Sequence, residues 1–245
     1  INEVIKQQLA STDYKPLAKE IEKYFFQSTV VLQDDRNTIK EVEFNNKVFV
    51  VKSYKVPSVV NSFIYTYLKK SKAWRAYEYG LKISKFTPKV IARIEYFQPL
   101  LGKSYLICEK FDADFNMQTP LFKQHPDKDV ILKQFAKFVF ELHKNNIIHH
   151  DLSPGNVLIK DTKQGYQFQI IDINRMVFKV LNGKDRAENF SKLWADNEDL
   201  LTILTAYAKV AKLDEKFITL GLFYNQRNKD RKTRKLKIKK ALGLC

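Results

Sequence analysis

Two kinds of hydrophobic pattern divide the chain. The first half contains β-like apolar runs at 28–33, 38–44, 47–54, 88–96 and 104–108. Turn-forming residues separate the first three runs, Asp34-Asp35-Arg36-Asn37 and then Asn45-Asn46. This pattern predicts an antiparallel meander that further strands extend.

Other stretches carry apolar residues at the three- and four-residue spacing of packed helices: 15–26, 69–81, 128–145 and 190–213. The strand pattern breaks at 109–114, where the mainly helical part begins. We therefore predict an α+β chain with an N-terminal lobe at 1–108 and a C-terminal lobe at 109–245.

Composition limits the classes of protein. The chain has 245 residues, 44% of them hydrophobic, which is enough for a proper core. A formal net charge of +16 indicates a polyanionic partner: a nucleotide, a nucleic acid or an anionic membrane surface. Cys108 and Cys245 do not suggest a disulfide framework, which fits a reducing cytosol. With no signal-peptide pattern and no apolar run near the roughly 18 residues of a membrane span, we expect neither export nor a transmembrane segment.

The stretch 147–159, IIHHDLSPGNVLI, carries the chemistry. Its apolar ends and polar centre predict a strand, a loop and a second strand. Asp151 precedes Asn156 by five residues. In a phosphoryl-transfer site of the protein-kinase type, an aspartate at this spacing accepts the proton of the attacking hydroxyl, and the asparagine holds a metal ion.

A second apolar run, 169–174, contains Asp172 at its end and supplies another candidate metal ligand. Two carboxylates and an amide then serve one Mg²⁺-nucleotide site. Two alternatives remain open. The stretch around Asp151 is also compatible with an ordinary loop in which His149 packs and Asp151 caps. A zinc site at His149, His150 and Asp151 is a further alternative, although no HExxH or CxxC motif accompanies it.

Lys52 closes the apolar sequence 48–52 within the strand predicted at 47–54, where a kinase keeps the lysine that pairs with nucleotide phosphates. Glu78, in the helix predicted at 69–81, is the carboxylate expected to hold that lysine. Lys52 is otherwise a solvated strand end, and Glu78 a surface acid that pairs with Arg75 or Lys82. At the break after residue 108, we expect backbone groups of Glu109 and Phe111 to hydrogen-bond an adenine.

The C-terminal segment 226–240, QRNKDRKTRKLKIKK, contains nine basic residues and one acidic residue. It is either a solvated helix face or a fraying tail, or else a binder of an anionic surface. Because no aromatic residue lies in it for bases to stack on, we do not expect a nucleic-acid partner.

Taken together, several motifs resemble the lipopolysaccharide kinase family, which comprises the Kdo and heptose kinases of Gram-negative cells and relatives in the Bacteroidetes. They are VKSYKVP at 51–57, KSKA at 70–73, RAYEYG at 75–80, HHDLSPGN at 149–156 and IDINR at 171–175. The resemblance covers roughly residues 30 to 210, and it implies the two-lobed protein-kinase-like fold.

Carried over by motif, the resemblance implies that Lys52 and Glu78 anchor phosphate, that Asp151 is the catalytic base, and that Asn156 and Asp172 bind Mg²⁺. The implied reaction is ATP-dependent phosphorylation of a core sugar on a membrane-embedded lipid. With the basic charge, this predicts a cytoplasmic protein bound peripherally at the inner face of the inner membrane.

The chain also departs from protein kinases. The turn at 34–37 has no glycine, His150 replaces a common arginine, and Asp-Ile-Asn at 172–174 replaces Asp-Phe-Gly. We therefore expect no activation-loop switch and no usual protein-docking groove. A compact Rio-like protein kinase and a nucleotide-binding pseudokinase scaffold remain the alternatives.

Overall fold

The computed structural model describes residues 3–241, so Cys245 lies outside the described residues. The chain divides into two compact units. Unit 1 comprises Ile1–Asp112 and Asp172–Asn174, and unit 2 comprises Ala113–Ile171 and Arg175–Cys245. The sequence-based division at 108/109 did not include the return of 172–174 to unit 1.

Unit 1 is built on a six-stranded sheet with the order β1-β5-β6-β4-β3-β2. Its strands are β1 Val4–Leu9, β2 Val31–Asp34, β3 Thr38–Phe44, β4 Lys47–Tyr54, β5 Val90–Phe97 and β6 Leu101–Glu109. Each pair is antiparallel, which confirms the predicted meander. Strand β1 was not predicted; it pairs with β5 at the edge of the sheet.

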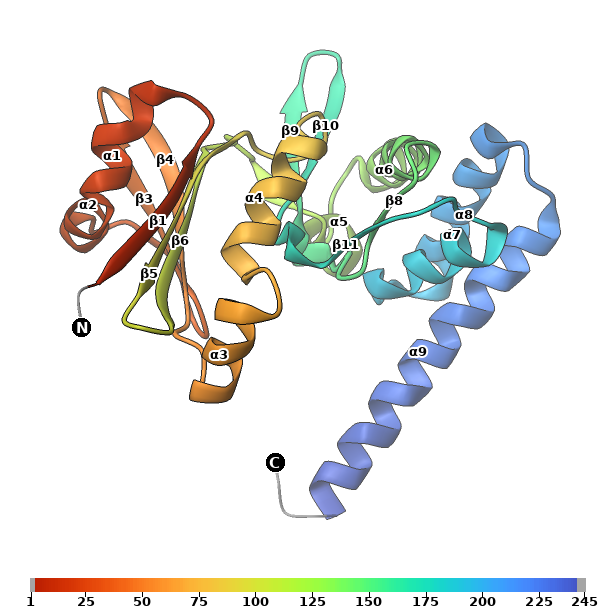
Figure 1. Ribbon diagram of the computed structural model, residues 1–245. Helices are drawn as coiled ribbons and strands as arrows, with labels where there is room; N and C mark the ends of the chain where they lie inside the picture. The colour runs from red at the N-terminus through yellow and green to blue at the C-terminus, as the bar shows by residue number, and fades with distance from the viewer. Residues whose placement is uncertain (1–2, 242–245) are drawn as a thin grey trace. The chain divides into compact units, whose positions relative to one another are not determined.

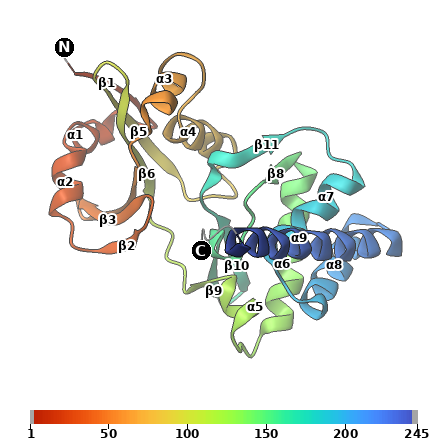
Figure 2. The same cartoon turned by 90° about the horizontal axis from the view of Figure 1, so that it is seen from below.

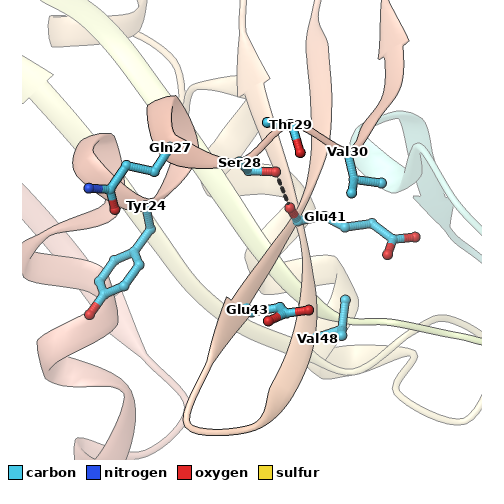
Figure 3. A pocket seen from close by; sticks show the side chains of 8 residues that line it. All are labelled: Tyr24, Gln27, Ser28, Thr29, Val30, Glu41, Glu43 and Val48. Carbon is cyan, nitrogen blue, oxygen red and sulfur yellow. Dashed lines mark hydrogen bonds between the residues drawn. The ribbon is translucent and has the colours of Figure 1, made fainter.

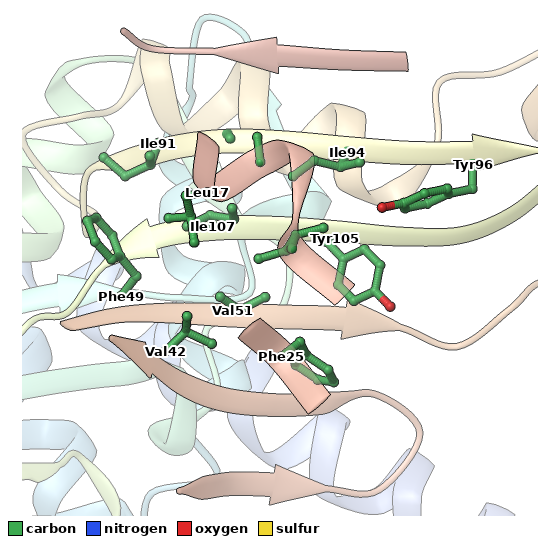
Figure 4. Close-up of a cluster of buried hydrophobic side chains, with 13 residues drawn as sticks. Leu17, Phe25, Val42, Phe49, Val51, Ile91, Ile94, Tyr96, Tyr105 and Ile107 are labelled. Carbon is green, nitrogen blue, oxygen red and sulfur yellow. The ribbon is translucent and has the colours of Figure 1, made fainter. Parts of the chain in front are cut away.

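One face of this sheet carries the main core of unit 1. After the short 3-10 turn η1 Thr12–Tyr14, the predicted helix at 15–26 forms as α1 Lys15–Lys19 and α2 Ile21–Gln27. Their apolar side chains pack on β3 to β6 in a buried cluster (Figure 4) of Leu17, Ala18, Ile21, Phe25, Val42, Phe49, Val51, Ile91, Ala92, Ile94, Tyr96, Tyr105 and Ile107. The predicted apolar spacing thus faces the sheet.

Helices α3 Val59–Tyr67 and α4 Lys72–Lys82 cover the other face (Figures 1 and 2). Ser71 caps α4 by accepting a hydrogen bond from the N–H of Trp74, and its hydroxyl donates to the buried carboxylate of Glu95. Gly80 lets α4 approach the sheet closely, because a Cβ there would collide with the side chain of Val90. These contacts fix α4 against β5 and β6.

Unit 2 is mainly helical, with α5 Gln118–Phe122, α6 Lys128–Lys144, α7 Gly183–Phe190, α8 Asn197–Ala211 and α9 Glu215–Ala241. Its short strands are β7 Phe115–Asn116, β8 Ile147–His149, β9 Val157–Thr162, β10 Gly165–Ile170 and β11 Met176–Phe178. They form a β10-β9-β7 sheet and a β11-β8 pair. The 3-10 turns are η2 Pro154–Asn156, η3 Ile173–Arg175 (residues of both units) and η4 Ser191–Leu193.

The prediction of one long helical stretch at 190–213 was wrong. Trp194 adopts a left-handed conformation, with a φ of 57°, and ends η4. Asp196 then caps a new helix, α8, by accepting a hydrogen bond from the N–H of Asp199. The apolar spacing continued through this break because Leu193 and Ala195 are buried too.

Helix α9 changes character along its length. Phe217, Gly221, Tyr224 and Asn225 are buried, whereas every residue from Asp230 to Ala241 is exposed. The basic segment at 226–240 lies within this helix. Across residues 3–241, we find no helix that is both long and apolar enough to cross a membrane.

Candidate active site

The loop between β8 and β9 carries the sequence-predicted catalytic residues of unit 2. The side-chain amide nitrogen of Asn156 donates to the backbone carbonyl of Asp151, at 2.8 Å, and the N–H of Asn156 donates to the carbonyl of Ser153, at 2.9 Å. This closes the loop on itself. Since the amide nitrogen is engaged, the amide oxygen of Asn156 is the atom suited to a metal ion.

His149 joins this loop to the end of β10. Its Nδ1 accepts a hydrogen bond from the N–H of Asp151, at 3.0 Å, so the proton lies on Nε2, which donates to the carbonyl of Ile171, at 2.9 Å. The ring is fully buried. His149 does pack, as the ordinary-loop alternative has it, but it also links the backbone of Asp151 to that of Ile171.

The zinc alternative finds no support. Both ring nitrogens of His149 are engaged with protein groups, which leaves neither for a metal. Among the residues that the structure describes, no group of three or more His, Cys, Asp or Glu side chains is placed to hold a metal ion.

The Asp151 carboxylate is half-buried and has a basic neighbour that sequence reasoning missed. Arg175 Nη1 lies 3.5 Å from Asp151 Oδ2. The carbonyl of Arg175 also accepts a hydrogen bond from the N–H of His150, at 3.1 Å. Arg175 was visible in the IDINR motif, but the pairing of β11 with β8 that brings it to the loop was not.

Asp172 lies in unit 1, in a left-handed conformation with a φ of 56°. A non-glycine residue in this region stores strain, a feature that is frequent at functional sites. Its Oδ1 accepts hydrogen bonds from Lys52 Nζ, at 2.7 Å, and from the Asn174 side chain, at 2.6 Å. Just before it, the N–H of Ile171 donates to the carbonyl of Asn156 at 2.9 Å.

Lys52 lies on β4, in the interior of the sheet, with a side chain that is only 14% exposed. A largely buried ammonium needs a counter-charge, and Asp172 supplies it. The ring of Tyr54 is the next neighbour, 5.3 Å from Lys52 Nζ. Burial, reinforced by the Asp172 carboxylate, holds the pKa of Tyr54 well above its usual value, so its hydroxyl stays protonated.

The expected Lys52–Glu78 ion pair is replaced by a local one. Glu78 accepts from Lys70 Nζ at 2.6 and 2.7 Å, while Lys52 pairs with Asp172. Lys70, Trp74 and Glu78 follow one another at four-residue spacing, and Lys70 Nζ lies 5.3 Å from the Trp74 ring. The lysine therefore runs along one face of α4 to a nearer partner, and this part of the prediction was wrong.

The adenine-binding groups predicted at the end of β6 also need one correction. The N–H of Glu109 is not free, because it donates to the carbonyl of Lys89, at 2.8 Å. The carbonyl of Glu109 and the backbone of Phe111 remain the proposed groups. By strand register, Cys108 pairs with Val50 and Leu106 with Lys52, so all four side chains share one face of the sheet. Burial raises the pKa of Cys108 to about 12, which keeps its thiol neutral.

A hollow of about 460 Å³ lies elsewhere in unit 1 (Figure 3). It is lined by Tyr24, Gln27, Ser28, Thr29, Val30, Glu41, Glu43 and Val48. Lys52, Glu78, Glu109 and Phe111 do not line it.

A buried chain of hydrogen bonds connects helices α8, α6 and α7 to the start of the catalytic loop. His143 joins the hydroxyl of Tyr207, at 2.9 Å from Nδ1, to the side-chain oxygen of Asn189, at 3.1 Å from Nε2. The Asn189 amide then donates to the carbonyl of His149 at 2.9 Å. Burial lowers the pKa of His143 to about 4, so the ring is neutral near pH 7. Sequence reasoning missed His143. Its position one residue after Leu142, on the apolar face of α6, was the signal that could have found it.

Comparison with known families agrees with this geometry. The sequence profile of the lipopolysaccharide kinase (Kdo/WaaP) family matches residues 75–213, more than half of the chain. The chain belongs to this family. Membership confirms the resemblance read from the motifs and places the chain among kinases, whose chemistry uses ATP and a divalent metal.

Individual relatives are more distant. A protein of Acanthamoeba polyphaga mimivirus named as a serine/threonine-protein kinase is 29% identical over 96 residues, 39% of this chain. The match spans 33% of the length of that curated relative. The similarity is therefore limited to part of each protein.

Solved structures give the fold. WaaP, solved in complex with acyl carrier protein, superposes with a TM-score of 0.60 at 14% identity, over 92% of this chain and 98% of that one. This confirms the predicted α+β, two-lobed protein-kinase-like fold. The Rio2 kinase–ADP/Mg²⁺-phosphoaspartate complex from Chaetomium thermophilum matches with a TM-score of 0.44 at 15% identity, over 89% of this chain and 76% of that one.

Proposed function

We propose that this protein transfers the γ-phosphoryl group of ATP to a sugar hydroxyl of a lipopolysaccharide core or a related glycolipid. The observation that carries the proposal is the pairing of Lys52 with a left-handed Asp172 in a chain of this kinase family. Lysine and aspartate at these motif positions are the phosphate-binding and metal-binding groups of kinase chemistry.

In the proposed step, the Asp151 carboxylate accepts the proton of the acceptor hydroxyl. The hydroxyl oxygen forms a bond to the γ-phosphorus while the bond from that phosphorus to the β,γ-bridging oxygen breaks, and ADP leaves. Lys52 binds the nucleotide phosphates. Glu109 and Phe111 offer backbone groups to the adenine, and Glu78 acts on the nucleotide site only through α4, since its carboxylate pairs with Lys70.

The donor groups suit magnesium. Mg²⁺ takes oxygen ligands, keeps several waters and needs only one or two carboxylates from the protein. We propose that the amide oxygen of Asn156 and the carboxylate of Asp172 hold it. When bound, the ion neutralises phosphate charge as the phosphoryl group moves.

We further propose that the acceptor is lipid-linked and that the protein docks peripherally on the cytoplasmic face of the inner membrane. The basic part of α9, Arg227 to Lys240, which is fully exposed from Asp230 onward, supports this. Each basic residue near an anionic leaflet contributes on the order of 1 kcal/mol, within a Debye length of about 8 to 10 Å.

Labelled ATP tests the proposal. The protein is incubated with lipopolysaccharide and, separately, with a generic protein acceptor. Transfer to the lipopolysaccharide supports the proposed function, whereas transfer to protein alone favours the Rio-like alternative. Nucleotide binding without transfer to either acceptor favours the pseudokinase scaffold.

A further inference from the structure

Helix α3 is attached to the sheet by hydrogen bonds from polar side chains. The buried hydroxyl of Ser62 donates to the carbonyl of Leu101, at 2.8 Å. Thr66, one turn later, accepts a hydrogen bond from the N–H of Leu101, at 2.9 Å, and donates to the carbonyl of Ser62, at 2.7 Å. Polar side chains thus fasten α3 to the start of β6.

Helix α3 and the residues just before and after it also expose six apolar side chains, which we call the α3 stripe. It consists of Val56, Val59, Val60, Phe63, Tyr67 and Leu68, exposed by 53%, 77%, 70%, 51%, 63% and 70%. The rings of Phe63 and Tyr67 contact one another, with centroids 5.0 Å apart. Single exposed apolar residues are common on proteins, but six within 13 consecutive residues indicate an interaction surface.

The charge around the stripe indicates what covers it. From Phe44 to Tyr77 the chain contains no acidic residue and seven basic ones. Lys55 precedes α3, and Lys69 and Lys72 follow it, all exposed. An apolar aromatic face bordered by lysines is the composition of helices that lie in the interface of an anionic bilayer.

A second copy of the chain fits less well. Two such surfaces would bring their lysines together, in a protein whose formal net charge is +16. Like charges at an interface oppose association. An anionic lipid surface offers both the apolar layer and the counter-charge.

We propose that the α3 stripe inserts into the headgroup region of an anionic bilayer, with Lys55, Lys69 and Lys72 against the headgroups. The inference rests on the proposed function only in its purpose, to hold the protein at a lipid-linked acceptor. It differs from docking by α9, because insertion adds a hydrophobic contribution that salt does not screen.

Vesicle co-sedimentation of the full chain tests insertion. The vesicles contain phosphatidylcholine with or without phosphatidylglycerol, at low and high salt. We expect the double variant Phe63→Asp/Tyr67→Asp to lower partitioning onto the anionic vesicles by about tenfold or more, with a residual difference at high salt.

Phe26→Asp is the matched control. Phe26 is 69% exposed near the end of α2, a helix that covers the other face of the sheet. Its replacement should change partitioning by less than about twofold, since it lies outside the stripe. Thermal melts of all variants show whether they are folded. Folded stripe variants that partition like the parent would overturn the proposal.

A fluorescence measurement locates the stripe directly. Phe63→Trp should show an emission shift to shorter wavelength with anionic vesicles, and quenching by brominated lipid, beyond those of the parent with Trp74 and Trp194. Absence of both changes in a variant that binds vesicles would contradict insertion. So would a stripe-dependent dimer in sedimentation equilibrium that takes the place of vesicle binding.

Phosphorylation of a delipidated core oligosaccharide, assayed without vesicles, separates this inference from the proposed function. The stripe variants should keep parental turnover there. If the parent shows no transfer yet binds vesicles through the stripe, the proposed function fails and insertion stands. If transfer persists and stripe-dependent binding is absent, insertion fails and the kinase proposal stands.

Discussion

At the scale of single residues, the Lys52–Asp172 ion pair is the interaction whose energy is best tested. A 14% exposed ammonium and a 34% exposed carboxylate lie 2.7 Å apart. We expect Lys52→Ala and Asp172→Ala to be non-additive in Mg²⁺-ATP binding, with a coupling of about 1–3 kcal/mol in a double-mutant cycle measured by calorimetry. Each residue loses part of its role once its partner is gone.

The exposed Lys70–Glu78 pair is the matched control. It is close, at 2.6 Å, but solvated. Its coupling should stay below about 0.5 kcal/mol. Strong coupling between Lys70 and Glu78 together with additive losses at Lys52 and Asp172 would reverse our assignment of the two pairs.

Lys52 and Asp172 were selected separately from the sequence as candidate site residues, but their contact with one another was not predicted. Lys52 and Asp172 were both expected at a nucleotide site from their positions at strand ends. Their direct bond, between residues 120 positions apart, depends on the return of 172–174 to unit 1. Glu78 was assigned to Lys52 by order along the chain, whereas in the structure it pairs with Lys70, which lies just before the N-terminus of α4.

At the scale of elements, the close packing of α4 on β5 depends on Gly80. Gly80→Ala adds a methyl group that meets Val90, and we expect it to cost roughly 1–3 kcal/mol of unfolding free energy despite the better helix propensity of alanine. Urea denaturation measures this. Gly183→Ala, where a Cβ meets nothing within 4 Å, should change stability by less than about 1 kcal/mol.

The helices that support the catalytic loop should show a pH signature. The pKa of His143 is lowered to about 4 in the folded state, against about 6.5 unfolded. The unfolded chain therefore binds a proton first, and stability falls by roughly 3 kcal/mol as the pH drops from about 6.5 to 4. Above about pH 6.5 the ring is neutral in both the folded and the unfolded state, so His143 causes no loss of stability there.

His143→Gln should remove most of that pH dependence, as followed by urea denaturation across this range. The control is His150→Gln, at an exposed position in the loop between β8 and β9. A parental pH slope in His143→Gln, or its loss in His150→Gln instead, would show that the buried ring is not its source.

The boundaries of helices and strands were predicted most accurately where the local sequence signals were strong. Strands β3 and β4 have the predicted bounds, and α6 ends at Lys144, beside the predicted stop at Asn145-Asn146. Asn146 has a φ of 60°, which asparagine tolerates. Helix α3, Val59–Tyr67, was not among the predicted helices, so the exposed stripe on it was not predicted either.

At the scale of the whole molecule, its charge should govern attraction to anionic surfaces. Neutralising part of the exposed end of α9, with Lys235→Gln and Lys239→Gln, should weaken binding to phosphatidylglycerol vesicles at low salt by about tenfold or more. At high salt the difference from the parent should vanish. Vesicle co-sedimentation across a salt series checks this, and an unchanged affinity at low salt would remove α9 from the docking surface.

The central claim is phosphoryl transfer with Asp151 as the base, and phosphate transfer from labelled ATP to lipopolysaccharide tests it most directly. Asp151→Asn should lower turnover by about 10²-fold or more and leave nucleotide affinity nearly intact. Asp161→Asn, at an exposed position on β9, should keep parental turnover. Parental turnover in a folded Asp151→Asn variant would contradict the account.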